Sequence, residues 1–220
     1  MAQLTQLTRL VISRSLFDDR DGGCPTLVRE VLGGLRQLQV LDLSHQRMWT
    51  RDALAGLVDS LPATVLRTLD LSCALCPLTN GTQLPADALG LQRLQRLQRL
   101  QALRELNLSL NDLGKDADCD DMIGALPHLP ELQRLDLSQN MLRDSHAVAL
   151  VNAIMHAPEL RFLDLSLNGF TDVGVSMLVA AAASHRGRLA SLSITQQGRV
   201  QFSLATIGLW REAFACGTLL

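Results

Sequence analysis

Two short motifs hold residue types that could perform chemistry. The first is Cys73-Ala-Leu-Cys76, a pair of thiols at the spacing found in zinc sites and redox-active dithiols. Neither a second cysteine pair nor a histidine at ligand spacing accompanies it. We therefore expect these two cysteines to bind no metal and to take part in no redox reaction.

The second motif is the acidic run from Asp116 to Asp121, which opens with the D-x-D-x-D pattern of a calcium loop. Asp121 stands at the position where such a loop requires glycine, and Pro127 stands where the bidentate glutamate belongs. The loop would lose both its sharp turn and its main ligand. The run instead predicts the start of a helix, where the helix dipole favours acidic side chains.

Catalytic motifs are also missing from the sequence. The five histidines form no metal-binding or nucleophile-activating arrangement, and the chain has no G-x-S-x-G, phosphate loop or paired-carboxylate motif. We predict that the protein is not an enzyme. We expect it to use no metal, no cofactor and no small-molecule substrate.

Composition limits the kinds of partner. The chain has 220 residues, 20 basic against 22 acidic side chains and 47% hydrophobic residues. A nearly neutral chain lacks the broad basic surface that nucleic acids or anionic membranes attract, so we expect neither as a partner. No signal peptide or membrane-length apolar run is present, and the five cysteines are scattered. The sequence predicts a cytoplasmic, intracellular protein with free thiols that is not secreted.

The elements that position these residues are repeats. The phrase L-x-x-L-x-L occurs seven times, at intervals of 31, 28, 37, 29, 28 and 29 residues. Three apolar side chains at relative positions 1, 4 and 6 point inward from a short strand and from the turn that leads into it. The phrases begin at Leu7, Leu38, Leu66, Leu103, Leu132, Leu160 and Leu189.

Segments between the phrases have helical periodicity, such as Val148, Leu150, Val151 and Ile154, and we expect Asp144 to cap the helix that follows it. The predicted unit is therefore strand, turn, helix, turn. Strands stack about 4.8 Å apart while helices need about 8–10 Å, so the stack must curve. We predict an α/β solenoid of about seven repeats over residues 1–197, shaped as a curved horseshoe arc with parallel strands on the concave face and helices on the convex face.

The 28–29-residue period and the continuation N-x-L/F-x-D, present at Asn140–Asp144 and Asn168–Asp172, resemble the ribonuclease-inhibitor-like class of leucine-rich repeats. The resemblance covers residues 4–197. It implies a horseshoe that binds proteins, and it implies that the asparagine after each strand bonds backbone groups of the turn. The class also contains the Ran GTPase-activating protein and ciliary regulatory subunits.

We name the concave surface of the strands the strand face. Its central row, between the last two Leu or Ile of each phrase, contains Val11, Asp42, Asp70, Asn107, Asp136, Asp164 and Ser193. Carboxylates on adjacent strands would repel, by about 1 kcal/mol in water and about 3 kcal/mol at an effective dielectric of about 20. Two explanations are open. Arginines of the chain itself could neutralise the row, namely Arg67, Arg104, Arg134 and Arg161. Alternatively, the row could bind a basic peptide.

Beside this row, Arg134 and Phe162 are the candidate anchor of the strand face, because arginine and aromatic residues dominate binding energy at interfaces. The alternative is that Phe162 only packs on its neighbours.

One unit is longer than the others because of three L-Q-R triplets within residues 91–101. A three-residue period spreads leucines around a helix, so we expect some of them to be exposed. The triplets are either an expansion tolerated on the convex side or a docking bump that contains Arg93, Arg96 and Arg99.

The two ends differ. Residues 198–220 predict a helical segment in which Trp210 and Phe214 stand at helical spacing. The segment could cap the last repeat, dock another subunit or begin a further repeat. At the other end, the first strand phrase begins without a polar cap, which solenoids normally carry, so we expect neighbours in a larger assembly to cover it.

These observations favour a non-catalytic scaffold that binds a protein partner through the strand face, through exposed solenoid ends, or through both. Two alternatives are a structural subunit of a large intracellular assembly, of ciliary or ribosomal type, and a regulator of a GTPase or ATPase that resembles Ran GTPase-activating protein.

Overall fold

The computed structural model describes residues 5–13, 31–45, 58–74, 96–115, 119–184 and 189–195. These residues contain seven short strands. Each strand is three residues long and lies within one L-x-x-L-x-L phrase. The strands are β1 (Arg9–Val11), β2 (Val40–Asp42), β3 (Thr68–Asp70), β4 (Glu105–Asn107), β5 (Arg134–Asp136), β6 (Phe162–Asp164) and β7 (Ser191–Ser193).

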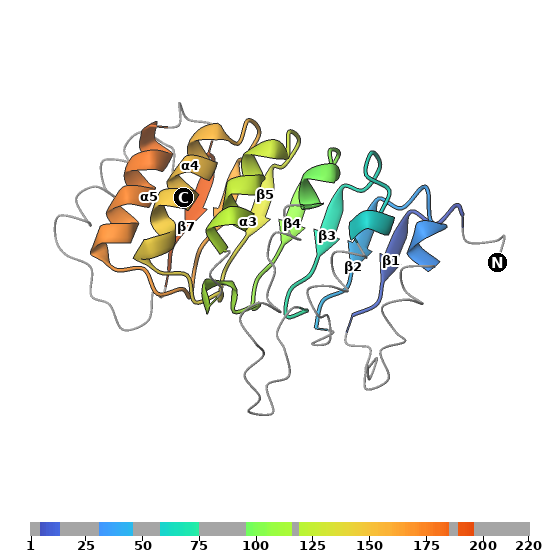
Figure 1. The fold of residues 1–220 in the computed structure, drawn as a ribbon, viewed down its shortest axis with the longest axis horizontal. Helices are drawn as coiled ribbons and strands as arrows, with labels where there is room; N and C mark the ends of the chain where they lie inside the picture. The colour runs from blue at the N-terminus through green and yellow to red at the C-terminus, as the bar shows by residue number, and fades with distance from the viewer. Residues whose placement is uncertain are drawn as a thin grey trace.

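The strands form a single open parallel sheet in the order of the sequence, from β1 to β7 (Figure 1). Their register follows the repeat, since Leu41 pairs with Leu69, Leu106 with Leu135, and so on along the stack. Equivalent residues of successive repeats therefore stand side by side, and each row of the sheet is one position of the repeat.

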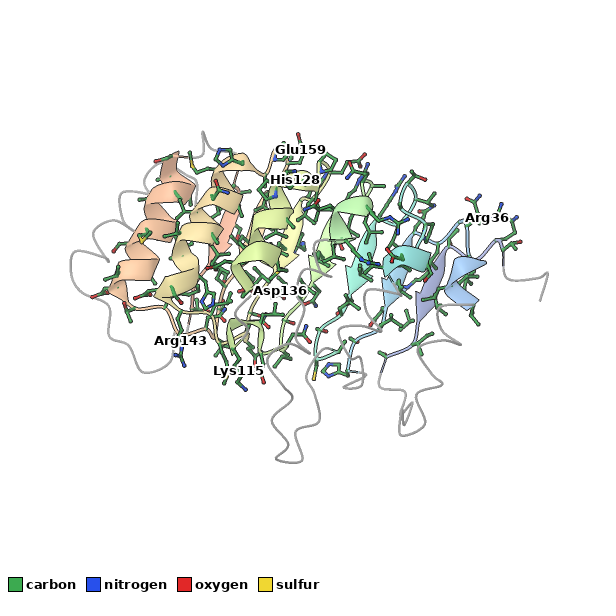
Figure 2. The ribbon with its side chains drawn as sticks, in the orientation of Figure 1. Arg36, Lys115, His128, Asp136, Arg143 and Glu159 are labelled. Atoms are coloured by element: carbon green, nitrogen blue, oxygen red, sulfur yellow. The ribbon has the colours of Figure 1, made fainter. Side chains whose placement is uncertain are left out.

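Helices form a second layer on one side of this sheet (Figure 1). Three α-helices whose bounds lie wholly within the described residues pack in series, with α4 between α3 and α5. They are α3 (Cys119–Ala125), α4 (Ala147–His156) and α5 (Asp172–Ser184), and the 3-10 helices of the same part of the chain include η4 (Leu113–Lys115), η5 (Leu126–His128) and η6 (Asp144–His146). Residues 31–33 and 58–60 are also helical, and residues 96–99 form a 3-10 turn. The loops that leave the strands and those that enter them lie at opposite edges, with Arg143 and Lys115 at one edge and Glu159 and His128 at the other (Figure 2).

The core lies between the two layers and consists of the leucines that define the repeat. From the second phrase to the seventh, the side chains at relative positions 1, 4 and 6 are 0% to 8% exposed. This arrangement confirms the predicted α/β solenoid with parallel strands on one face and helices on the other. Among the described residues, no helix has the length and apolar character needed to cross a membrane.

The first repeat is covered less completely than the others. Leu7, Leu10 and Ile12 are only partly buried against the core, whereas the equivalent Leu38 and Leu41 of the next repeat are 0% exposed. The N-terminal edge is thus the more open part of the described core, as the sequence predicts.

One local prediction needs correction, and another is only partly tested. Asp144 does not cap the helix after it; its carboxylate accepts hydrogen bonds from the backbone N–H and the hydroxyl of Thr171, in the turn before α5 of the next repeat. Of the leucines in the L-Q-R run, Leu97 and Leu100 are buried at 2% and 0% exposure, so neither is one of the exposed leucines that the run predicts. Leu91 and Leu94 lie outside the described residues.

Candidate functional site

The Asp and Asn side chains in the central row of the strand face stabilise the turns that follow β2 to β6. A side-chain oxygen of each Asp or Asn accepts the backbone N–H of the serine two residues later, at 2.8–3.0 Å, which forms an Asx turn at the end of the strand. The acceptors are Asp42, Asp70, Asn107, Asp136 and Asp164. The phrase L-D-L-S therefore has a local cause, and Asn107 shows that an uncharged amide serves the same purpose.

The residue after each of these serines has a left-handed backbone, which is costly for a residue other than glycine. Its N–H nevertheless donates to the carbonyl of the residue that occupies the position of the serine in the next repeat; the Leu110 N–H, for example, bonds the Ser138 carbonyl at 3.0 Å, and the Leu167 N–H bonds the Thr195 carbonyl at 2.8 Å. The residues with this conformation are His45, Cys73, Leu110, Gln139 and Leu167, with φ between 52° and 61°. Bonds between repeats thus hold the turn in place and fix the direction in which the chain leaves the strand face.

A buried row of asparagines joins consecutive repeats below these turns. The Asn168 Oδ1 accepts the N–H groups of Asn140 and Leu142, both at 3.0 Å, and its Nδ2 donates to the carbonyls of Leu137 and Leu165 at 3.0 and 2.9 Å. Asn140 bonds Asn111 and Leu108 of the preceding repeat in the same way. These contacts confirm the role that the resemblance implies for these asparagines.

Charges of the row are not neutralised as the first explanation predicts. Within the described residues, no ion pair joins Asp42, Asp70, Asp136 or Asp164 to an arginine; Asp70 instead accepts a bond from the Asn107 Nδ2 at 3.1 Å. Two of the arginines proposed as counter-charges form ion pairs with glutamates instead. Arg104 pairs with Glu131 at 3.0 Å, and Arg161 pairs with Glu159 at 3.6 Å.

The register arranges the carboxylates in two pairs. Asp42 stands beside Asp70, and Asp136 stands beside Asp164, while Asn107 separates the two pairs. Neighbouring strands lie about 4.8 Å apart. Since no arginine of the described residues pairs with these carboxylates, a cation placed between the two carboxylates of a pair could contact both.

The candidate anchor residues meet on neighbouring strands. Arg134 on β5 and Phe162 on β6 are register partners, and the Arg134 guanidinium lies 4.6 Å from the centre of the Phe162 ring. Phe162 is still 37% exposed. Together with Asp136 and Asp164 they form a cluster that offers an apolar ring, a guanidinium and two carboxylates; Figure 2 labels Asp136 near the middle of the solenoid. We call these four residues the β5–β6 cluster.

The arginines of the predicted docking bump have a partner within the chain. Arg96 pairs with Asp59, and the Arg99 Nη1 lies 2.7 Å from the other oxygen of the same carboxylate. One half-exposed aspartate of the preceding repeat thus holds both guanidinium groups. Arg93, and Trp210 and Phe214 of the predicted C-terminal docking segment, lie outside the described residues, as does residue range 198–220 as a whole.

A surface that the sequence does not single out lies on the helical side. Val148 and Met155 of α4 and Val173 of α5 are 66%, 41% and 63% exposed. Val148 belongs to the apolar pattern that predicts the helix between β5 and β6, but the prediction that this side chain faces the core is wrong. The spacing in the sequence could have shown this, because residues two apart, such as Val148 and Leu150, point to opposite sides of a helix.

Comparisons with known proteins agree with this architecture. A family model described as Leucine Rich repeat matches residues 100–116, which include β4, and residues 156–179, which include β6 and part of α5. The leucine-rich repeat-containing protein LegL7 from Legionella pneumophila has a similar solved structure, with a TM-score of 0.55 at 20% identity. The match covers 86% of this chain and 57% of LegL7, so the chain spans little more than half of that protein.

An internalin, InlF from Listeria monocytogenes, aligns with 13% identity over 96% of this chain and 79% of its own, but its TM-score of 0.28 is too low to support an argument. No curated protein sequence matches the chain. The repeat geometry, the family model and the similarity to LegL7 together make this chain a leucine-rich repeat protein by fold.

Proposed function

We propose that this protein is a non-catalytic scaffold that binds a protein partner through the strand face. The main support is the β5–β6 cluster, where an exposed aromatic ring and a guanidinium lie beside two carboxylates that pair with no arginine of the described residues. Aromatic and arginine side chains supply most of the binding energy at protein interfaces. The function of leucine-rich repeat proteins of the ribonuclease-inhibitor-like class, to which we also assign the chain as part of this proposal, agrees with it.

The strand face is rigid enough for this purpose. Each strand is bonded to its neighbours, and the turns after β2 to β6 are each held by an Asx bond and by a bond to the next repeat. A backbone held in this way loses little further freedom on binding, which lowers the entropic cost of forming a complex.

The carboxylate pairs indicate the chemistry of the partner. Their centres are three strand spacings apart, or about 14 Å, and an extended chain covers this distance in about four residues. We propose that the partner presents an extended segment with two basic residues about four positions apart, one opposite Asp42 and Asp70 and the other opposite Asp136 and Asp164.

The experiment compares binding of peptides with arginines four residues apart to the wild-type chain and to a variant with Asp42, Asp70, Asp136 and Asp164 all changed to Asn. Asn107 already makes the Asx bond, so we expect the variant to fold. The matched control changes Asp112, Asp120, Glu131 and Glu159 to their amides, which alters the net charge equally on other surfaces. The proposal predicts that binding is lost only with the strand-face variant. Equal losses with both variants, or no binding by the wild type, would refute it.

The cluster is tested separately with Phe162→Ala. Loss of the ring removes the apolar contact and the surface on which Arg134 lies, so we expect at least tenfold weaker binding, equivalent to about 1.4 kcal/mol. If Phe162→Ala binds the peptide with unchanged affinity, Phe162 and Arg134 do not belong to the binding surface. The role of the carboxylate pairs is tested by the first experiment alone.

One observation favours binding through a solenoid end as a second function. β1 is an edge strand, and the core residues behind it, Leu10 and Ile12, are only partly buried. A structural subunit whose neighbour covers this edge would contact these two side chains. Leu10→Ala should then weaken binding of the neighbour and leave peptide binding to the strand face intact, because Leu10 pairs with the buried Leu41 and does not belong to that face.

A further inference from the structure

One face of the Phe162 ring is covered by an arginine, and the other is directed away from it. The Arg134 guanidinium lies over the ring, 4.6 Å from its centre, and comes from β5, the strand on one side of β6. Side chains stand roughly perpendicular to a sheet, so the opposite face of the ring is directed toward β7. We call it the β7-side ring face. The register partner of Phe162 on β7 is Ser191, whose side chain is too short to cover a phenyl ring, and Phe162 remains 37% exposed.

A carboxylate stands on the same strand as this ring. Asp164 lies two residues after Phe162, so both side chains project from the strand face, with their Cα atoms about 7 Å apart. One oxygen of Asp164 accepts the Ser166 N–H at 2.8 Å. Within the described residues, no ion pair joins this carboxylate to a basic side chain. The ring and the carboxylate are thus close enough for one long side chain to contact both.

The charges around the β5–β6 cluster favour one further cation. Arg134 is the cation of the cluster, and its register partner on β4 is Glu105, on the side away from Phe162. Asp136 and Asp164 follow two residues later on β5 and β6. Strands β4 to β6 therefore contain three carboxylates and one guanidinium. A second positive charge reduces this excess of negative charge, although Arg134 is already present.

We propose that the β7-side ring face and Asp164 form a subsite that binds an arginine side chain of the partner in preference to lysine. This inference rests on the proposed function, since it specifies the basic residue that lies opposite Asp136 and Asp164. A guanidinium is planar and weakly hydrated, so it stacks flat on the ring while N–H groups at its edge donate to the carboxylate. A lysine ammonium is a compact, strongly hydrated charge that pairs with the carboxylate but gains less from the ring.

The other carboxylate pair has no aromatic ring beside it. The residues that occupy the position of Phe162 on β2 and β3 are Val40 and Thr68, and both are half-buried. Neither side chain has a π face, so a cation between Asp42 and Asp70 is held by charge and hydrogen bonds alone. We therefore expect the preference for arginine to be confined to one of the two basic residues of the partner.

Isothermal titration calorimetry of the full chain with four peptides tests the proposal. The peptides have their two basic residues four positions apart, as Arg/Arg, Arg/Lys, Lys/Arg and Lys/Lys. The wild type should bind the Lys/Lys peptide about fivefold more weakly than the Arg/Arg peptide, as expected for loss of a cation–π contact at an exposed site. The better of the two mixed peptides should match the Arg/Arg peptide, because only one position requires a guanidinium.

Two variants of Phe162 test whether the ring causes the preference. Phe162→Leu keeps an apolar side chain at this exposed position but has no π face, and Phe162→Ala removes the side chain beyond Cβ. In both variants the ratio of the Arg/Arg and Lys/Lys affinities should fall below about twofold. The control is Val148→Ala, which truncates an exposed apolar side chain of the helical layer and should keep the wild-type ratio. Far-ultraviolet circular dichroism establishes that each variant is folded.

The outcomes separate this subsite from the proposed function. Equal binding of the Arg/Arg and Lys/Lys peptides by the wild type refutes the subsite and leaves the proposed function standing. A preference that persists in Phe162→Leu comes from the carboxylates and also refutes it, as do two mixed peptides that are both as weak as the Lys/Lys peptide. If the wild type binds none of the four peptides, the subsite and the proposed function are both wrong.

Discussion

Replacing Asn168 by alanine should destabilise the solenoid more than any other single polar substitution in the rows described above. The side chain is 6% exposed, and its Oδ1 is the acceptor of two backbone N–H groups, those of Asn140 and Leu142, each at 3.0 Å. Both donors belong to residues that are 0% exposed, so water does not readily replace the lost oxygen. The substitution also removes the donor to the carbonyl of Leu137.

The size of the expected destabilisation follows from the two backbone N–H groups that lose their acceptor. An unsatisfied buried N–H costs about 1–3 kcal/mol, so two of them give a loss of about 4 kcal/mol in the free energy of unfolding. This is a large part of the total of about 5–15 kcal/mol that is usual for a domain. Because the bonds join consecutive repeats, the loss falls on the interface between them, which is the main source of cooperativity in a solenoid.

Urea unfolding followed by far-ultraviolet circular dichroism measures this effect as a shift of the midpoint. The control is Asn107→Ala, which removes an amide from the strand face. Asn107 is half-buried and its Oδ1 accepts a single N–H, so the expected loss is about 1 kcal/mol. If Asn168→Ala cost no more than this control, the buried asparagine row would not hold the repeats together and the reasoning would be wrong.

Three further predictions concern the turns and the surface. Asp136→Ala should lower the free energy of unfolding by about 1 kcal/mol because it removes the Asx bond to the Ser138 N–H, whereas Asp136→Asn should leave urea unfolding nearly unchanged. Gly114→Ala should cost more than about 2 kcal/mol, since its Cβ would lie 2.2 Å from the carbonyl oxygen of Met141, while Gly124→Ala, with nothing within 4 Å, should stabilise by about 0.5–1 kcal/mol in thermal unfolding. Arg96→Ala with Arg99→Ala should change stability by less than about 1 kcal/mol, because their ion pairs with Asp59 are half-exposed; a larger loss that persists at high salt would contradict this expectation.

Most of the fold could be predicted because the same residue types recur at the same positions of successive repeats. Leu41, Leu69 and Leu106 occupy the same position of successive phrases, so their inward direction and mutual register follow from a single period. Asn111, Asn140 and Asn168 could be assigned to the backbone in the same way. The strand-face residues were located correctly for the same reason, although their binding role stays a proposal.

The sequence by itself determined the repeat length, the seven strands, the leucines of the core and the residues that share the strand face, since these depend on local periodicity. Only the tertiary structure decided which residues of neighbouring repeats meet. It brought Arg96 and Arg99 to Asp59, Asp144 to Thr171 of the next repeat, and Arg134 over Phe162. It also turned Val148 and Val173 toward solvent. The period of the sequence fixes which strand residues are register partners. It does not fix the conformations of long side chains or the contacts of segments outside the strand phrases, and these depend on how the repeats stack in three dimensions.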